Sequence, residues 1–454
     1  MLVFTRFWSQ AAGGLPQVFW TLWAALLVNR VGAFGMLFLP LYLTEGRGLS
    51  LTMAGLVTAG YGIGGAGGSL LGGVLADTWG RRATMVTANG VAAALMLALG
   101  FAEPLPLIAV LTALVGVFHS MPGPATVAAI IDVVPEDGRA RAFNLQFWAF
   151  NLGTAVAAAL AGLVASVDFF LLFALDAAMT AVTAVIVRVA VPETLALSRE
   201  TGVLERRGTS RPARPWSTRP WPPRPWGQRP GRPASAQQRV ADPTRRPGGL
   251  ITALTDPAFM AFVGLTFVLA LLGSQSSILQ LAMDGDGLPP SAYGIVAAVP
   301  GVLIVLGQLF VPRLIAGRLK GRVLALAVAF TGIGYLTVTF ADVFGAYLAA
   351  AAIWTVGQML AAPPNAEVIA ELAPAELRAR YQAVFFLTFP ASGFVAPALG
   401  GWSLEHLGDV HWILVGLVGL AAAGGHLLAS GPRERRVARM LSARVAAPGV
   451  GVPA

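Results

Sequence analysis

A few ionisable side chains interrupt the long apolar stretches of this 454-residue sequence, and they are the first candidates for chemistry. Arg30 lies in the middle of the stretch LLVNRVGAFGMLFLPLYL, where its guanidinium could bind an acidic group of a solute or influence a nearby carboxylate. A structural ion pair is the alternative role for this arginine. Because burying an unpaired charge is costly, each such residue is expected to be either paired or functional.

Three further residues in apolar stretches could carry a proton, namely Glu367, His119 and Asp176. Glu367 is the first choice, because it is the acid expected deepest on a helix that lines a cavity, where burial favours the protonated form. Its alternative role is an ion pair that holds two helices together. His119 could titrate near neutral pH, and a neutral, hydrogen-bonded histidine is an equally good interpretation. Asp176 is the second-rank proton carrier.

Neutral polar side chains on the same stretches could form hydrogen bonds with a bound solute. Three of them are assigned to the pathway with the charged residues: Gln358, Asn365 and Gln275. Such groups also bridge neighbouring helices in membranes. The aromatic residues on these helices, which would suit an apolar ligand, are Phe34, Phe38, Trp148, Phe150, Trp354, Phe385, Phe386 and Phe389.

A short polar loop, GVLADTWGRR at residues 73–82, stands out from its apolar surroundings. Asp77 closes an apolar helix, and Gly80 permits a tight turn, with positive φ if the loop needs it. Arg81 and Arg82 cannot enter hydrocarbon and hold this end of the helix at the membrane surface. An aspartate at such an edge can pair with an arginine or with a helix N-terminus. Together with Gly73, these residues are called the loop motif below.

The composition identifies the elements that must position these residues. Hydrophobic residues make up 56% of the chain and charged residues only 12%, about half of the ~25% that is typical of soluble domains. A spanning helix needs about 20 apolar residues. Twelve segments meet this requirement, near 18–43, 50–76, 83–102, 106–131, 140–165, 168–190, 257–283, 290–316, 321–341, 345–370, 379–404 and 410–430. We therefore expect an all-α polytopic membrane protein with twelve transmembrane helices.

Basic residues gather in alternate loops between these segments. Arg81 and Arg82 follow the second segment, Arg139 and Arg141 follow the fourth, and residues 193–250 follow the sixth. By the positive-inside rule, these loops and both termini are cytoplasmic, in a multi-pass protein of the cell membrane. The net charge of +9 is therefore mainly an orientation signal, and no nucleic-acid partner is expected.

The sequence also repeats itself at a spacing of 239 residues, without a gap, from about 48 to 162. Pro135-Glu-Asp-Gly-Arg-Ala-Arg141, for example, matches Pro374-Ala-Glu-Leu-Arg-Ala-Arg380. Because six helices separate equivalent positions, the two units have the same orientation and form a parallel repeat. The predicted domains are an N-terminal six-helix bundle at 1–192 and a C-terminal six-helix bundle at 251–432.

Residues 193–250, between the two bundles, are rich in arginine, proline and tryptophan and include RPARPWSTRPWPPRPW. Proline at this density prevents a helix, and the segment has no apolar periodicity. We interpret it as a disordered cytoplasmic linker, with binding of a partner or of anionic lipid as the alternative. Residues 433–454 are expected to be a cytoplasmic tail.

These features resemble the major facilitator superfamily of secondary transporters, over nearly the whole chain except the linker and the tail. The family's loop after helix 2 reads Gly-x-Leu-Ala-Asp-(Arg/Lys)-x-Gly-Arg-(Arg/Lys), and residues 73–82 depart from it only at Thr78. The ending Val191-Pro-Glu-Thr194 also resembles the family's sixth helix. The resemblance implies a central site between the bundles, alternating access, and contacts of the loop motif that lock one conformation. The second repeat has Ala316 in place of Asp77 and Lys320 in place of Arg81, so a one-sided lock is expected.

The branch of the superfamily that the chain resembles is that of the drug:proton antiporters, although helix 5 lacks the Gly-Pro core of many exporters and helix 4 lacks their arginine. The expected function is proton-coupled efflux of a hydrophobic small molecule or drug by a monomer in the lipid bilayer. One alternative is a proton-coupled importer of an organic anion or small nutrient, with Arg30 as the anion ligand. Another is a non-transporting membrane sensor or scaffold.

The sequence also lacks motifs that would indicate an enzyme or a cofactor site. It shows no Walker loop and no nucleophile elbow, it contains no cysteine, and it has no paired histidine or cysteine spacing for a metal. We therefore expect neither an enzyme nor a cofactor, and the predicted partners are a small-molecule substrate and protons.

Overall fold

The computed structural model describes residues 13–195, 250–308, 310–373 and 377–445, and this part of the chain is helical with no β-strand. Most of the predicted linker and the last residues of the predicted tail lie outside the described residues. Ten helices or helix runs in the described part are long and apolar enough to cross a membrane. The prediction of an all-α polytopic membrane protein is confirmed.

The first half of the chain contains α2 (Gln17–Val31), α3 (Leu39–Leu41), η1 (Tyr42–Gly46), α4 (Leu51–Thr78), α5 (Arg81–Phe101), α6 (Leu105–Ser120), α7 (Pro122–Val133), α8 (Glu136–Ala165) and α9 (Phe169–Ala190). Two predicted segments are absent from the ten apolar spans. The first is divided into α2, α3 and η1, and the second, α4, is rich in glycine, which lowers its hydropathy.

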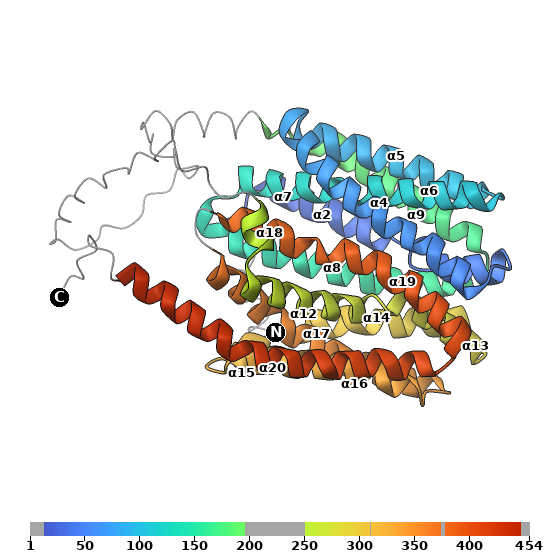
Figure 1. The fold of residues 1–454 in the computed structure, drawn as a ribbon. Coiled ribbons are helices and arrows are strands. Elements are labelled where there is room, and N and C mark those ends of the chain that lie inside the picture. Colours follow the sequence, from blue (N-terminus) through green and yellow to red (C-terminus); the bar gives the residue numbers. More distant parts are fainter. Residues whose placement is uncertain (1–12, 196–249, 309, 374–376, 446–454) are drawn as a thin grey trace, which may run out of the picture.

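The second half contains α11 (Leu250–Leu254), α12 (Pro257–Gly273), α13 (Ser276–Gly285), α14 (Pro290–Gly307), α15 (Val311–Ile315), α16 (Lys320–Val338), α17 (Phe344–Leu372), α18 (Arg378–Phe386), α19 (Thr388–Leu407) and α20 (Val410–Val445). Figure 1 shows the first half, in blue to green, above the second half, in yellow to red. The last helix continues into the predicted tail as far as Val445.

The first transmembrane segment is interrupted between Val31 and Leu39, where residues 32–38 are not helical. Gly32 and Gly35 lie in this interruption. A side chain on Gly35 would lie 3.0 Å from atoms of both Met96 and Phe173, so the extended segment packs closely on α5 and α9. The interruption leaves backbone N–H groups without helical partners, and these need acceptors elsewhere.

Two helix pairs join the halves, α4 with α19 and α8 with α14. Glycines permit this contact: a Cβ on Gly62 would lie 2.5 Å from the carbonyl carbon of Gly393, and one on Gly294 would lie 2.6 Å from the oxygen of Ala158. Backbones that approach this closely are typical of helix packing in membranes. These close contacts lie away from the end of the molecule that carries Arg81, which we call the basic end.

The opposite end carries Glu45, Asp284 and Glu405, and we call it the acidic end. The carboxyl groups of Glu45 and Asp284 lie within hydrogen-bonding reach of each other across the two halves, and these residues are 239 positions apart, the spacing of the sequence repeat. Glu405 accepts a hydrogen bond of 2.6 Å from the backbone N–H of Thr52, at the start of α4. The molecule is therefore closed at the acidic end.

Burial at this closure, and then the hydrogen bond and the charge of Asp284, raise the pKa of Glu45 to about 7. Two carboxyl groups can share a hydrogen bond only when one is protonated, which explains the direction of the shift.

Candidate functional site

An open cavity of about 720 Å³ lies in the first half of the molecule. Its walls come from α2, α4, α5, α6, α7, α8 and α9, and Phe386 of α18 is the residue that the second half contributes. The lining residues of α8 belong to the half of that helix nearer the basic end, and those of α2 extend to its last turn. Since the acidic end is closed, this cavity is accessible from the basic end.

The cavity has a polar and an aromatic wall. Its polar lining residues are Asn29, Arg30, Tyr61, Ser69, Asn89, His119, Ser120, Thr126, Gln146 and Thr183. Phe143, Phe147 and Phe150 lie on one face of α8, spaced by four and three residues, and Phe386 completes the aromatic wall. The site can therefore hold a molecule with an apolar body and a polar group.

A second, small cavity of about 40 Å³ adjoins the polar wall. Four residues line both cavities: Asn29, Arg30, Tyr61 and His119. Asp176 lines the small cavity from α9. The structure thus brings together three of the predicted site residues, Arg30, His119 and Asp176, although they are far apart in the sequence.

Asp176 is almost completely buried, with 1% of its surface exposed. One carboxylate oxygen accepts a 3.0 Å hydrogen bond from the backbone N–H of Gly35, and the other accepts a 3.3 Å hydrogen bond from the hydroxyl of Thr180. The interruption of the first transmembrane segment supplies the free N–H group. The carboxyl group of Asp176, which is buried and titratable, is therefore hydrogen-bonded to the backbone of that segment.

Arg30 lies in the last turn of α2. Its guanidinium carbon is 4.6 Å from the centre of the Phe150 ring, a cation–π contact that covers one face of the charge. Among the described residues, its buried Nε has no hydrogen-bond partner. The same is true of Nε2 of His119, whose ring packs edge-on against Tyr61 at 6.2 Å.

The candidates in the second half lie elsewhere. Gln275, Gln358 and Asn365 line neither of these two cavities. Gln275 is 5% exposed and packs on Gly400, and the amide of Gln358 lies close to Gly273. The sequence predicted a site shared by the two bundles, whereas the cavity described here is lined almost entirely by the first bundle.

Glu367 is at the basic end and not in the interior, where the sequence analysis expected it. Its side chain is 57% exposed and forms a 2.8 Å ion pair with Lys320, the first residue of α16. Glu371, one turn later on α17, pairs with the same lysine. This contact matches the alternative considered for Glu367, an ion pair between two helices.

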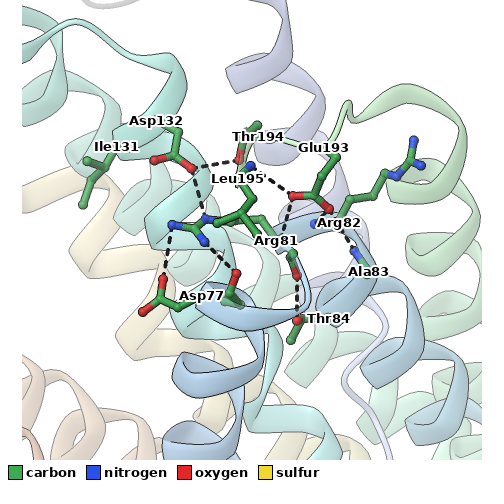
Figure 2. Close-up of polar contacts among 12 residues, drawn as sticks. Asp77, Arg81, Arg82, Ala83, Thr84, Ile131, Asp132, Glu193, Thr194 and Leu195 are labelled. Carbon is green, nitrogen blue, oxygen red and sulfur yellow. Dashed lines mark hydrogen bonds and ion pairs between the residues drawn. The ribbon is translucent and has the colours of Figure 1, made fainter. Parts of the chain in front are cut away.

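The loop motif forms an ion-pair network at the basic end (Figure 2). Arg81 contacts Asp77 at 3.2 Å and Asp132 at 3.1 Å, and its guanidinium also donates a 2.6 Å hydrogen bond to the carbonyl of Ala76. Gly80 has φ of +126°, which requires glycine at the turn. A side chain on Gly73 would meet no atom within 4 Å, so close packing does not explain this glycine.

Two residues that follow the sixth segment, Glu193 and Thr194, complete this network. Glu193 accepts hydrogen bonds of 2.8 and 3.1 Å from the backbone N–H groups of Arg81 and Arg82, and so caps the N-terminus of α5. Thr194 donates a 2.9 Å hydrogen bond to Asp132. Asp132, Glu193 and Thr194 were not among the residues predicted for the motif, although the ending Val-Pro-Glu-Thr could have indicated the last two.

The second repeat forms a corresponding network. Lys320 and Glu371 are equivalent to Arg81 and Asp132 at the spacing of 239 residues, and Glu367 supplies a second carboxylate. The second half therefore also carries an ion-pair network at this end, which the expectation of a one-sided lock did not include. An acid one turn earlier on α17 replaces the acid that is missing from the loop of the second repeat.

Comparisons with known proteins agree with this architecture. The model of the Major Facilitator Superfamily matches residues 22–319 and 258–444. An uncharacterised MFS-type transporter of Bacillus subtilis (strain 168), YttB, is 28% identical over 405 residues, which are 87% of this chain and 90% of that protein. YqjV of the same organism, also described as an uncharacterised MFS-type transporter, is 31% identical over 142 residues, 31% of this chain and 34% of that protein.

Solved structures show the same fold. The crystal structure of the peptide transporter POT has a TM-score of 0.71 at 16% identity, covering 94% of this chain and 98% of that one. The nucleoside transporter NupG has a TM-score of 0.66 at 13% identity, covering 90% and 99%. The chain therefore belongs to the Major Facilitator Superfamily and is a membrane transporter, not an enzyme.

Proposed function

We propose that this protein is a proton-coupled transporter of a small amphipathic organic molecule, in which Asp176 carries the coupling proton. The observation that supports this most is the shared cavity of Arg30, His119 and Asp176, next to an open cavity with an aromatic wall. By the positive-inside rule, the basic end faces the cytoplasm. The structure then corresponds to a conformation that is open to the cytoplasm and closed on the outer side.

Asp176 is suited to coupling because its charge changes a backbone contact as well as the electrostatics of the cavity. In its ionised form it accepts hydrogen bonds from Gly35 and Thr180. Protonation removes part of that acceptor strength and weakens the contact that holds the interrupted segment against α9. Interruptions of this kind line the binding sites of many secondary transporters.

Efflux of a hydrophobic small molecule, the function first expected from the sequence, is supported by the aromatic wall of the cavity. Phe143, Phe147, Phe150 and Phe386 would hold a planar apolar body that enters from the cytoplasm. In exchange for it, a proton would enter from outside and bind Asp176. At 16% and 13% identity, the peptide transporter POT and the nucleoside transporter NupG share only the fold with this chain, so neither supplies a substrate for it.

Uptake of an organic anion is the second candidate, and Arg30 favours it. A cation at the polar wall, with an unpartnered Nε, can bind an acidic group. Protons would then move in the same direction as the substrate.

The test is transport by the purified protein in liposomes of both orientations with an imposed pH gradient, over a panel of neutral, cationic and anionic aromatic compounds. Proton-coupled transport requires that the gradient drives accumulation of at least one compound and that the compound's own gradient moves protons. Accumulation in inside-out vesicles with an acidic lumen indicates efflux, and accumulation in right-side-out vesicles with an acidic exterior indicates uptake. Substrate flux that never moves protons would refute the proposal.

A further inference from the structure

Two residues that line the small cavity each carry a buried hydrogen-bonding atom without a partner. Arg30 Nε and His119 Nε2 are both unpartnered among the described residues, and both side chains line the cavity of about 40 Å³. A buried polar atom of this kind normally has a partner, so its absence points to a ligand or a water molecule. A carboxylate is planar and matches the donor geometry of a guanidinium.

Arg30 also forms no direct ion pair with a described residue. No described carboxylate lies within the 4.0 Å ion-pair distance of its guanidinium, and Asp176 directs its oxygens to Gly35 and Thr180 instead. Phe150 covers one face of the guanidinium, which leaves its edge for another group. The edge of the guanidinium is therefore available to a further anionic group.

From this geometry we infer that the substrate carries a carboxylate, which binds Arg30 and His119 while its apolar body lies on the phenylalanine wall of α8, and that a proton on Asp176 accompanies it. This inference rests on the proposed role of Asp176 in proton coupling. It places uptake of an organic acid ahead of efflux of a neutral compound.

The accompanying proton follows from the charges that face Asp176. Arg30 on α2 is the cation, Tyr61 on α4 and His119 on α6 are neutral in their usual buried forms, and Thr180 on α9 is uncharged. With Asp176 ionised, the site is already neutral, and a bound carboxylate would add an unbalanced negative charge. With Asp176 protonated, the carboxylate neutralises Arg30. The proton on Asp176 and the bound carboxylate therefore each favour binding of the other, as transport of both in the same direction requires.

The test measures binding of matched aromatic carboxylates and their amides, such as 3-phenylpropionate and 3-phenylpropionamide within a wider panel, to the purified full-length protein. We expect at least one acid to bind more tightly than its amide, and its affinity to rise by about fivefold or more from about pH 8 to about pH 6. Arg30→Gln should remove the preference for the acid, and Arg30→Lys should retain part of it. Equal binding of every acid and its amide, or an unchanged preference in Arg30→Gln, would overturn the inference.

Asp176→Asn separates this inference from the proposed function. The variant resembles the protonated state, so it should bind the acid as tightly at about pH 8 as the wild type does at about pH 6, while losing proton-driven accumulation. If it binds the acid with the pH dependence of the wild type, Asp176 is not the accompanying proton site. If it binds the acid without pH dependence but still accumulates it with the pH gradient, the proposed function fails and the anion site remains.

Discussion

The two halves of this transporter share a fold and an ion-pair network but differ in their interiors. Arg81 with Asp132 in the first half corresponds to Lys320 with Glu371 in the second. In contrast, the positions 239 residues after Arg30 and Asp176 are Leu269 and Val415. The repeat therefore preserves the contacts at the basic end, while the charged residues that line the two cavities, Arg30 and Asp176, belong to the first half.

This difference indicates a division of roles. The first half supplies nearly all of the cavity and the titratable group, and the second half supplies Phe386 and the surfaces that seal the acidic end. The second half can then act mainly as the body against which the first half moves.

The largest effect is expected from a comparison of Asp176→Asn with Glu367→Gln. Asp176→Asn should reduce proton-driven accumulation by about 5–150-fold, the range of a typical coupling free energy of about 1–3 kcal/mol, and should still permit exchange of substrate down its own gradient. Glu367→Gln should reduce accumulation much less, because the side chain is half exposed and Glu371 remains to pair with Lys320. Accumulation and exchange in the same liposomes provide the measurement.

A loss of coupling in Glu367→Gln, with normal insertion and normal coupling in Asp176→Asn, would reverse the division of roles. Glu367 would then be the proton carrier that the sequence first indicated.

The two networks at the basic end should differ in their contribution to stability. In the first half the side chains of Arg81 and Asp132 are both 7% exposed, so Asp132→Asn should destabilise the protein by about 3–5 kcal/mol, as expected when a buried ion pair is broken. In the second half the side chains of Lys320 and Glu371 are 33% and 36% exposed, and Glu371→Gln should cost less than about 1 kcal/mol. Thermal unfolding of the purified variants measures both; equal losses would show that the networks are equivalent.

The contact between the halves can be weakened at a single glycine. A Cβ on Gly62 of α4 would lie 2.5 Å from Gly393, and overpacking of this kind typically costs about 1–3 kcal/mol. Gly62→Ala should therefore favour opening of the acidic end, whereas Gly67→Ala, on the same helix, meets no atom within 4 Å and is the control. Because the chain contains no cysteine, labelling of Met283→Cys, a position 1% exposed in the closed state, reports the opening.

Gly67→Ala should leave the labelling rate of Met283→Cys unchanged. The same rate in Gly62→Ala and Gly67→Ala would mean that these glycine contacts do not control the closure.

The smallest effect is expected at the acidic pair, where one residue from each half shares a hydrogen bond. The pKa of Glu45 is raised to about 7 in the closed state, so proton uptake stabilises closure. That stabilisation is complete below the ordinary range of a glutamate and is lost as the pH rises through about 7. Labelling of Met283→Cys should therefore be faster at about pH 8 than at about pH 6, and Glu45→Gln should remove the dependence. A variant that keeps the full pH dependence would assign it to another group.

The sequence predicted the fold because hydropathy and the repeat are properties of whole segments. The buried charges could be listed for the same reason, since a charge in an apolar stretch is conspicuous. What the sequence did not provide is the direction in which each side chain points. The helices are apolar on nearly every face, so no periodicity distinguishes a residue in the cavity from one in a helix contact.

Asp176 and Glu367 illustrate how side-chain direction was missing from the sequence. Lys320, the partner of Glu367, lies 47 positions earlier and is adjacent to it only because α16 and α17 pack together. Asp176 was ranked second among the proton carriers, and its contact with the interrupted first segment depends on a break in the helix that the apolar pattern did not reveal. The role of Asp132 could have been predicted in part from the sequence, because its equivalent in the second repeat, Glu371, is also acidic.

The contact between Asp176 and Gly35 has a further consequence, because the donor is a main-chain N–H. Apart from proline, every amino acid at position 35 presents the same donor, so side-chain substitutions there change the packing on Met96 and Phe173 without removing the hydrogen bond. Related sequences that lack the acid at position 176 are therefore not expected to show a matching change of residue type at position 35. Replacing the amide between residues 34 and 35 by an ester removes the donor alone, and it would separate the role of the backbone from that of the proton.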